Sequence, residues 1–209
     1  MMGSLECAEA RIRAILSRSS VPEDSRHAEN VLEWVLRLDP DADEALQIAA
    51  LAHDIERAVG ERKVRRADVA DYDAFKAAHA ANSAAVVREV LGEAQVEPTI
   101  VEEACRLVEA HEAGGDPRSD LLKDADSLSF FEINLPLYLA REGHDEALRR
   151  CLWGYGRLSA RGRELLRTWP AGTSADATAR EARKLLCEVS DEVCEPRDLS
   201  RCVPPRRLR

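Results

Sequence analysis

The chain has 209 residues, 45% of them hydrophobic and 33% charged, and it carries a net charge of −9 at pH 7. This length suits one domain with a full core, and the negative charge argues against non-specific binding of nucleic acid or of a membrane surface. Ala, Leu, Glu and Arg are abundant and only 4% of the residues are aromatic, which favours an all-α fold over sheets.

The six cysteines include no Cys-x-x-Cys pair, which is typical of reduced thiols in a cytosolic protein. The N-terminal segment has the pattern of an amphipathic helix and not of a signal peptide, and no apolar run approaches the length of a membrane span. We therefore expect a cytoplasmic protein with no membrane partner. The sequence leaves open whether the chain forms a homo-oligomer.

Apolar periodicity and capping residues predict one helical domain over residues 1–192, followed by a basic, poorly ordered tail over 193–209. The expected helices span about 5–18, 22–38, 44–59, 71–91, 98–111, 117–136, 145–169 and 174–188. Ser19 or Ser20 should cap the second helix, Gly92 should end the fourth, and Pro136 should kink or end the sixth. The charged loop 61–71 lies beside the third helix, where it could serve as a lid.

The third expected helix places His53 next to Asp54 inside an otherwise apolar run. Burying an imidazole and a carboxylate costs several kcal/mol unless they are paired or bound to a cation, and a divalent metal suits both. Four of the five histidines and two aspartates form an ordered series: His27, His53, Asp54, His79, His111 and Asp126. Each histidine and Asp126 belongs to a different expected helix. The sequence therefore predicts a metal site where these helices converge.

The ligand types and their order predict one or two ions. A first ion would bind His27, His53, Asp54 and Asp126. A second would bind His79 and His111, with Asp54 bridging, as in two-metal hydrolases whose ions lie about 3.5–4 Å apart. Mixed nitrogen and oxygen ligands favour iron, manganese, cobalt or zinc over calcium, with magnesium as an alternative.

The ordered series, with the phrases LAHDIE and LLKDADSLSF, resembles the HD-domain superfamily of metal-dependent phosphohydrolases over about residues 27–128. The resemblance implies an HD-domain-like helical bundle with a metal-site core at about 20–143 and a C-terminal helical extension at 144–192. It also implies hydrolysis of phosphate esters or anhydrides. His79 and His111 resemble the extra histidines of the dinuclear branch, which includes cyclic-dinucleotide phosphodiesterases and dinucleoside tetraphosphate hydrolases.

Asp124 is a rival for the last ligand, because only one of two aspartates spaced two residues apart on a helix can easily face the metal. Asp126 is preferred because it follows Ala125 and precedes Ser127-Leu128, as the final aspartate of the HD superfamily follows an alanine and precedes x-Leu.

The HD resemblance implies that metal-activated water attacks the phosphorus of a small phosphorylated metabolite or nucleotide, with Asp54 at the catalytic centre. Arg57, Lys76 and Lys123 each lie about one helical turn from an expected ligand and are candidates for holding the phosphate. Glu56 and Glu112 adjoin expected ligands and are candidates for orienting a histidine or carrying a proton.

Two other functions fit the same residues. The ligand series also resembles that of HD-fold di-iron oxygenases, for which iron content and oxygen uptake would be diagnostic. A non-catalytic sensor that binds phosphate or a nucleotide is the third interpretation. The arginine-rich segment 149–167 leaves three roles open, namely substrate binding, partner binding and a surface helix.

Overall fold

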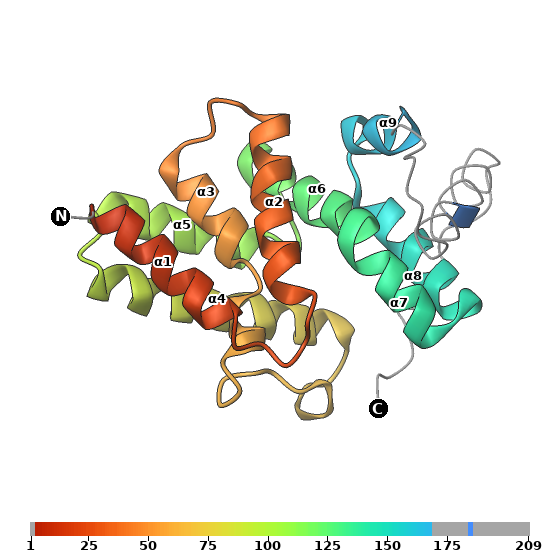
Figure 1. Ribbon diagram of the computed structural model, residues 1–209, viewed down its shortest axis with the longest axis horizontal. Helices are drawn as coiled ribbons and strands as arrows, with labels where there is room; N and C mark the ends of the chain where they lie inside the picture. Colours follow the sequence, from red (N-terminus) through yellow and green to blue (C-terminus); the bar gives the residue numbers. More distant parts are fainter. Residues whose placement is uncertain (1–2, 169–183, 186–209) are drawn as a thin grey trace. The chain divides into compact units, whose positions relative to one another are not determined.

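The computed structural model describes residues 3–168 and 184–185, and within them all regular structure is helical, as the composition predicted (Figure 1). The elements are α1 (Ser4–Leu16), α2 (Asp24–Leu38), α3 (Glu44–Ala52), the 3₁₀ helices η1 (Ile55–Ala58) and η2 (Arg66–Asp68), α4 (Tyr72–Glu93), α5 (Pro98–Ala110), α6 (Pro117–Ser129), the π-helical η3 (Phe130–Asn134), α7 (Leu135–Glu142), α8 (His144–Arg157) and α9 (Ala160–Thr168). None of the described helices is both long and apolar enough to cross a bilayer. Apart from residues 184–185, the expected helix 174–188 and the tail 193–209 lie outside the described residues.

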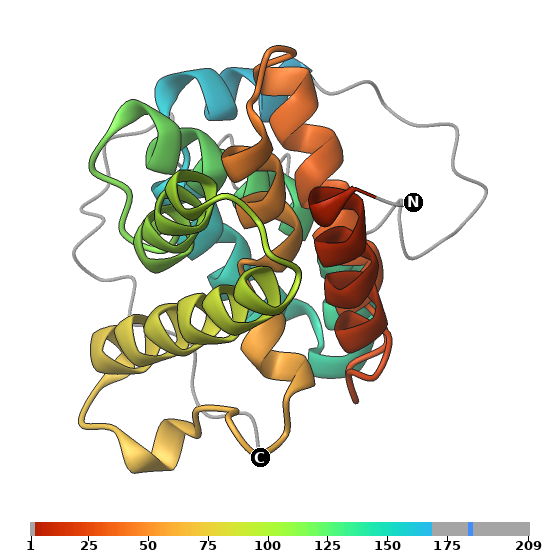
Figure 2. The same ribbon diagram turned by 90° about the vertical axis from the view of Figure 1, so that its left-hand side faces the viewer.

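The chain divides into two compact units, residues 1–126 and 127–209. In the first unit, α3 packs against α2 and α5, and α4 packs against α5 and α1. Figure 2 shows this unit from the side of α1 and α5, with the loop between η1 and α4 below them. All six candidate metal ligands belong to the first unit. The single domain expected from the sequence stays a prediction.

The short helix α3 is buried on nearly all sides, which explains its almost purely apolar sequence. Leu46, Ile48 and Leu51 are at most 2% exposed, and the intervening alanines are fully buried. Small side chains let neighbouring helices approach closely, and the large ones fill the space between them. Asp43 caps this helix by accepting a hydrogen bond from the Leu46 N–H at 3.0 Å. A capped, tightly packed helix therefore delivers His53 to the centre of the unit.

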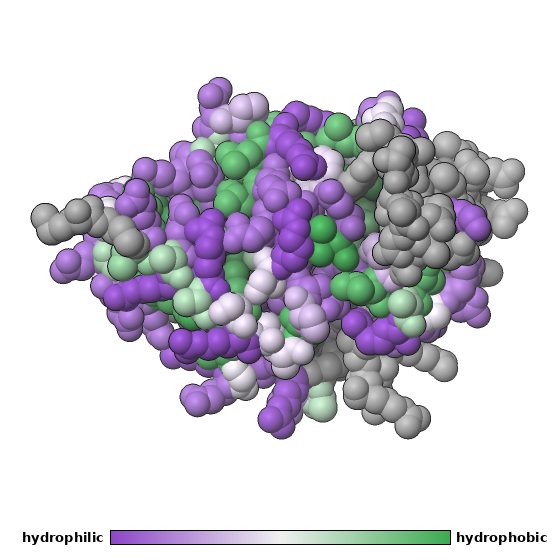
Figure 3. Space-filling model, viewed as in Figure 1, coloured by the Kyte–Doolittle hydropathy of each residue, from purple (hydrophilic) through white to green (hydrophobic). Residues whose placement is uncertain are grey.

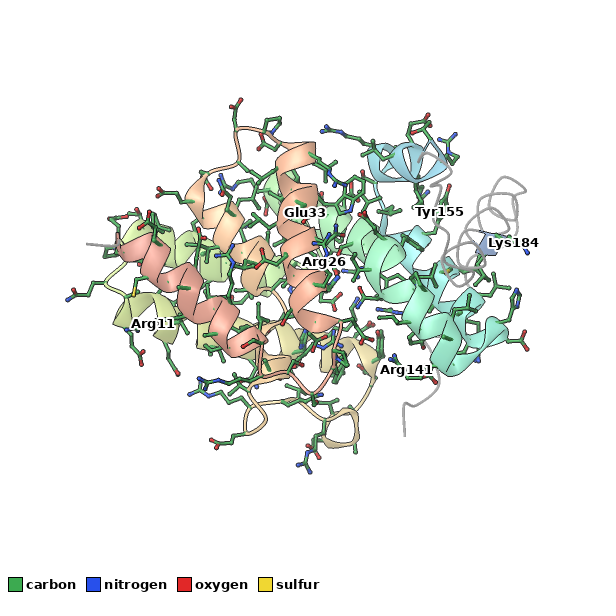
Figure 4. All side chains as sticks on the ribbon, viewed as in Figure 1. Arg11, Arg26, Glu33, Arg141, Tyr155 and Lys184 are labelled. Atoms are coloured by element: carbon green, nitrogen blue, oxygen red, sulfur yellow. The ribbon has the colours of Figure 1, made fainter. Side chains whose placement is uncertain are left out.

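Helix α2 is amphipathic and contributes one candidate ligand from its inner face. His27, Val31 and Trp34 are buried, whereas Arg26 and Glu33 form an ion pair at 2.8 Å on the outer face (Figure 4). Hydrophilic side chains cover α2 in the space-filling view, and the apolar patches beside it are small and separate (Figure 3). The buried histidine is therefore held by an ordinary core-facing stripe.

Two residues that we expected to mark helix ends, the serine cap of α2 and Gly92, do not mark them. Helix α2 begins at Asp24 with Glu23 as its N-cap; Ser19 instead donates a hydrogen bond to the Asp24 carboxylate at 2.5 Å and accepts one from the Val21 N–H. Helix α4 runs through Gly92 to Glu93, and the chain then turns at Gln95, whose φ is 56°. Because the Ser19 hydroxyl is already hydrogen-bonded within the turn before α2, it does not cap that helix.

In the second unit, the chain widens into the π-helical turn η3 before Pro136, which lies in the first turn of α7. The expected interruption near Pro136 is confirmed by this π-helical turn. Its physical reason is that proline has no N–H to donate to the preceding turn of a helix. The single helix expected over 145–169 is wrong, because the extended residue Leu158 separates α8 from α9. Ser159 accepts a hydrogen bond from the Gly162 N–H and so favours a new helix start.

Candidate metal centre

The structure brings together all six residues that the sequence singled out. They form two groups, and within each group one ligand atom from every residue lies within 4.8 Å of the others. The first group is His27, His53 and Asp126, and the second is Asp54, His79 and His111. Of the two rival aspartates, Asp126 is the one in the first group, as the sequence analysis preferred.

The doublet His53-Asp54 lies at a break in the helix, not inside it. The helix expected over 44–59 is wrong, because α3 ends at Ala52 and a 3₁₀ turn begins at Ile55. Asp54 has φ −106° and ψ 15°, a sparsely populated backbone region in which active-site residues are often found. Adjacent side chains on a regular helix point about 100° apart. The break allows both side chains to face the same centre.

Backbone carbonyls fix the orientation of two histidines. The Nδ1 of His53 lies 2.9 Å from the Ala50 carbonyl, and the Nδ1 of His111 lies 2.6 Å from the Val108 carbonyl. A carbonyl can only accept, so each Nδ1 carries a proton and donates it. Each Nε2 is therefore the atom offered to a ligand, which is the arrangement that metal-binding histidines commonly show.

Asp54 belongs to the second group and also directs an oxygen toward the first. Its Oδ1 lies 2.6 Å from the Nε2 of His79 and 3.8 Å from the Nε2 of His111. Its Oδ2 lies 3.8 Å from the Nε2 of His53. An oxygen near each group is what a ligand bridging two neighbouring ions requires, and the bridging role of Asp54 stays a prediction.

The donor atoms of the first group fit a divalent ion in spacing and in chemistry. Ligands about 2.1 Å from one tetrahedral ion lie roughly 3.4 Å apart. In the first group, the Oδ1 of Asp126 lies 3.2 Å from the Nε2 of His27 and 3.7 Å from the Nε2 of His53. The His53 ring is fully buried, and among the described residues its Nε2 has no hydrogen-bond partner. Such an atom facing two carboxylates is stabilised by a cation between them.

The carboxylates of the centre keep slightly more exposed surface than its imidazole rings. The side chains of His53 and His111 are 1% exposed, whereas those of Asp54 and Asp126 are 16% and 13% exposed. Solvent therefore reaches the carboxylate oxygens before the imidazole rings. A ligand in solution would meet the same side of the centre.

The candidate ligands span residues 27–126, and one known family covers this whole range. Its model, described as a domain of unknown function (DUF4202), matches residues 9–178. The chain belongs to the DUF4202 family. No curated protein and no solved structure matches this chain. In this DUF4202 member, all six candidate ligands lie inside the matched range.

A buried carboxylate supports the second group of the DUF4202 centre. Glu56 is 1% exposed, and its Oε1 lies 2.6 Å from the Nδ1 of His79, which leaves the Nε2 of that ring directed at Asp54. The Oε2 of Glu56 accepts a hydrogen bond at 3.0 Å from the N–H of Val64, in the loop after η1. A carboxylate behind a histidine ligand fixes the ring orientation and raises its basicity. The structure thus favours the orienting role considered for Glu56.

The three candidate phosphate-binding residues are all held by acidic partners. Arg57 contacts Asp54 at 2.7 Å and Asp24 at 3.4 Å, and its side chain is 34% exposed. Lys76 pairs with Glu112 at 2.8 Å. These two cations therefore lie at the edge of the centre.

Lys123 instead contacts Asp120 in its own helix α6 at 2.9 Å and, in the loop between α5 and α6, the Ala113 carbonyl at 3.2 Å. Gly114 in this loop has φ +73°, and a side chain there would collide with Asp120. Lys123 therefore stabilises the turn that follows His111.

The sequence offers no reason to single out Asp24, which is 4% exposed, because an acidic residue in the first turn of a helix is ordinary.

The carboxylates hold two rings protonated when no metal is bound. Burial lowers the pKa of His53, but Asp54 and Asp126 outweigh it and raise the pKa to about 9. In the same way, burial lowers the pKa of His79, but Asp54 and Glu56 outweigh it and raise the pKa to about 10. Burial lowers the pKa of His111 to about 4, so this ring is neutral and ready to bind. Two protons thus occupy a centre that suits two cations.

Metal affinity should therefore rise with pH. Each group must lose one imidazole proton before it can bind an ion, so the apparent affinity of each group should rise about tenfold per pH unit between pH 6 and 8, below the two raised pKa values. Zn²⁺ titrations against a chelator at pH 6, 7 and 8 would measure this slope. An affinity that does not change over this range would show that both rings are already neutral.

Proposed function

We propose that this protein is a metal-dependent phosphohydrolase that uses two divalent transition-metal ions, and that its family is related to the HD-domain superfamily. Iron, manganese, cobalt and zinc are the ions that the donor set favours, with magnesium as an alternative. The observation that carries the proposal is the position of Asp54, with one oxygen directed at each of two buried groups. The substrate is a small phosphorylated metabolite or nucleotide.

The chemistry divides between the ions and the chain. Two bound ions would lower the pKa of a water molecule and stabilise charge on the phosphoryl oxygens. His27, His53 and Asp126 would hold one ion, His79 and His111 the other, and Asp54 both. The buried rings close the centre from behind, so the substrate approaches over the partly exposed carboxylates. In this proposal the phosphoryl group binds near Arg57 and Lys76, which pair with Asp54 and with the neighbour of His111.

Arg57 and Lys76 supply positive charge for the phosphate. In the metal-free protein Arg57 neutralises the Asp54 oxygen that faces the first group. An ion bound there would compete for that oxygen, and Arg57, still held by Asp24, could turn its exposed edge to a phosphate. Lys76 and Glu112 form the corresponding pair at the second group. In this proposal both cations bind the phosphate and neither binds a metal ion.

Metal analysis followed by a phosphatase screen tests this function. The purified protein should retain about two ions per chain and should release phosphate from nucleotides, dinucleotides or sugar phosphates with Mn²⁺, Fe²⁺, Co²⁺, Zn²⁺ or Mg²⁺. A metal-loaded protein that releases none would refute hydrolysis. Iron retention with oxygen uptake would identify a di-iron oxygenase, and ligand binding that persists unchanged in His53→Ala, after loss of the metal, would identify a sensor.

A further inference from the structure

The first turns of α4 carry a row of aromatic rings that ends at a candidate metal ligand. The rings of Tyr72 and Phe75 lie 6.1 Å apart at 22°, and those of Phe75 and His79 lie 6.2 Å apart at 10°. All three rings are therefore nearly parallel. Residues at these helical spacings share one face, so the row follows from the sequence pattern Tyr72-x-x-Phe75-x-x-x-His79.

This row leads from the surface to the metal centre. His79 is buried, whereas Tyr72 and Phe75 are half-buried, and the helix begins at Tyr72 directly after the loop drawn at the bottom of Figure 2. Only nine residues of the chain are Phe, Trp or Tyr, and two of them, Tyr72 and Phe75, have neighbouring rings beside the candidate metal centre. A core position would bury both rings fully; here each keeps exposed surface.

A cation lies in the same turn as the two rings. Lys76 Nζ is 5.9 Å from the centroid of the Tyr72 ring and 2.8 Å from Glu112, the neighbour of the ligand His111. Along the chain the order is Tyr72, Phe75, Lys76 and His79, spread over about two helical turns of 5.4 Å each, and the Phe75 ring itself lies next to His79. A molecule with a flat ring at one end and a phosphate at the other matches this order in chemistry and in scale.

We propose that the face formed by Tyr72 and Phe75 stacks the aromatic ring of the substrate, and that the substrate class is the nucleoside monophosphates. This inference rests on the proposed hydrolase function for the position of the phosphate. The base lies parallel to Phe75, the phosphate lies between Lys76 and the ions, and the ribose spans the distance between them. Tyr72 and Phe75 are specificity-determining residues; they do not touch the reacting atoms.

Adenosine 5′-monophosphate and ribose 5-phosphate form a matched pair of probes, because they differ only at C1′, where the base replaces a hydroxyl group. Their dissociation constants are measured by calorimetry in the presence of a chelator, where no turnover occurs, and their kcat and KM with Mn²⁺. The wild-type protein should bind the nucleotide roughly 5- to 150-fold more tightly, the usual range for one stacked base. The Phe75→Leu and Tyr72→Leu variants should bring this ratio toward one, while the ribose 5-phosphate constant changes less than about twofold.

Tyr138→Leu, which removes an aromatic ring in the second unit, is the matched control and should leave the ratio unchanged. If Phe75→Leu fails to fold, Tyr72→Leu at the start of the helix carries the test. An unchanged ratio in both variants, or no saturable nucleotide binding with or without Mn²⁺, overturns the inference. Equal affinity for phenyl phosphate and the nucleotide overturns the nucleoside assignment. Preserved stacking without turnover under any metal refutes hydrolysis alone.

Discussion

Asp54→Asn should release both metal ions from the protein. This carboxylate offers one oxygen to each group of ligands, so a neutral amide weakens both at once. We expect kcat/KM for phosphate release to fall by more than about 100-fold, because changes behind the ligands alone often cost 10- to 100-fold. Metal analysis after dialysis and a phosphatase assay measure the two effects.

The matched control is Asp145→Asn, the same chemical change on a fully exposed carboxylate in the second unit. It should leave both metal content and turnover at the wild-type level. His79→Ala adds a second comparison, because it should lower the metal content by only one ion. If Asp54→Asn retains both ions, the two groups are independent sites and Asp54 bridges nothing.

Glu56→Gln should empty the second group while the first retains its ion. The amide keeps the shape of the side chain and its oxygen can accept the His79 proton, but it removes the buried charge that makes the ring a strong ligand, and its NH₂ group cannot accept from the Val64 N–H. We expect metal affinity at that group to fall by about 10- to 100-fold, and the stoichiometry after dialysis to fall from two ions to one. Stoichiometric titration with Zn²⁺ distinguishes the two groups.

Glu61→Gln provides the comparison, because Glu61 is an exposed carboxylate in the loop next to η1. It should bind two ions like the wild type. A Glu56→Gln protein that binds two ions with unchanged affinities would mean that Glu56 serves only the fold, through its hydrogen bond to the Val64 N–H. Equal weakening of both groups would point to a general loss of structure.

The candidate ligands could be predicted from the sequence because residue types and their order along the chain are read from it directly. The bridging role of Asp54 was predicted by analogy with two-metal hydrolases, and Asp126 was preferred because its neighbours resemble those of the final aspartate in the HD superfamily. The break after Ala52 could not be predicted, since the segment contains no glycine or proline. It goes with contacts made by side chains: the Ala50 carbonyl accepts from the His53 ring, and Asp54 pairs with Arg57. Tertiary contacts override the helical propensity here.

The supporting residues were harder to foresee than the ligands. Spacing along a helix suggested that Lys123 faces the centre, yet its long side chain reaches the loop after α5. Asp24 has no sequence signal at all, because its burial and its contact with Arg57 depend on how α2 and η1 pack. The parallel rings of Tyr72 and Phe75 could be placed on one face from spacing, but their exposure could not.

A metal ion in the first group would also stabilise the fold, because it would join His27 to Asp126. They are about 100 residues apart, so an ion bound by both acts as a cross-link that closes a long loop of the unfolded chain. Binding that is confined to the folded state adds about 4 kcal/mol of stability when free metal exceeds its dissociation constant a thousandfold. The lifetime of this protein in a cell would then follow the supply of metal.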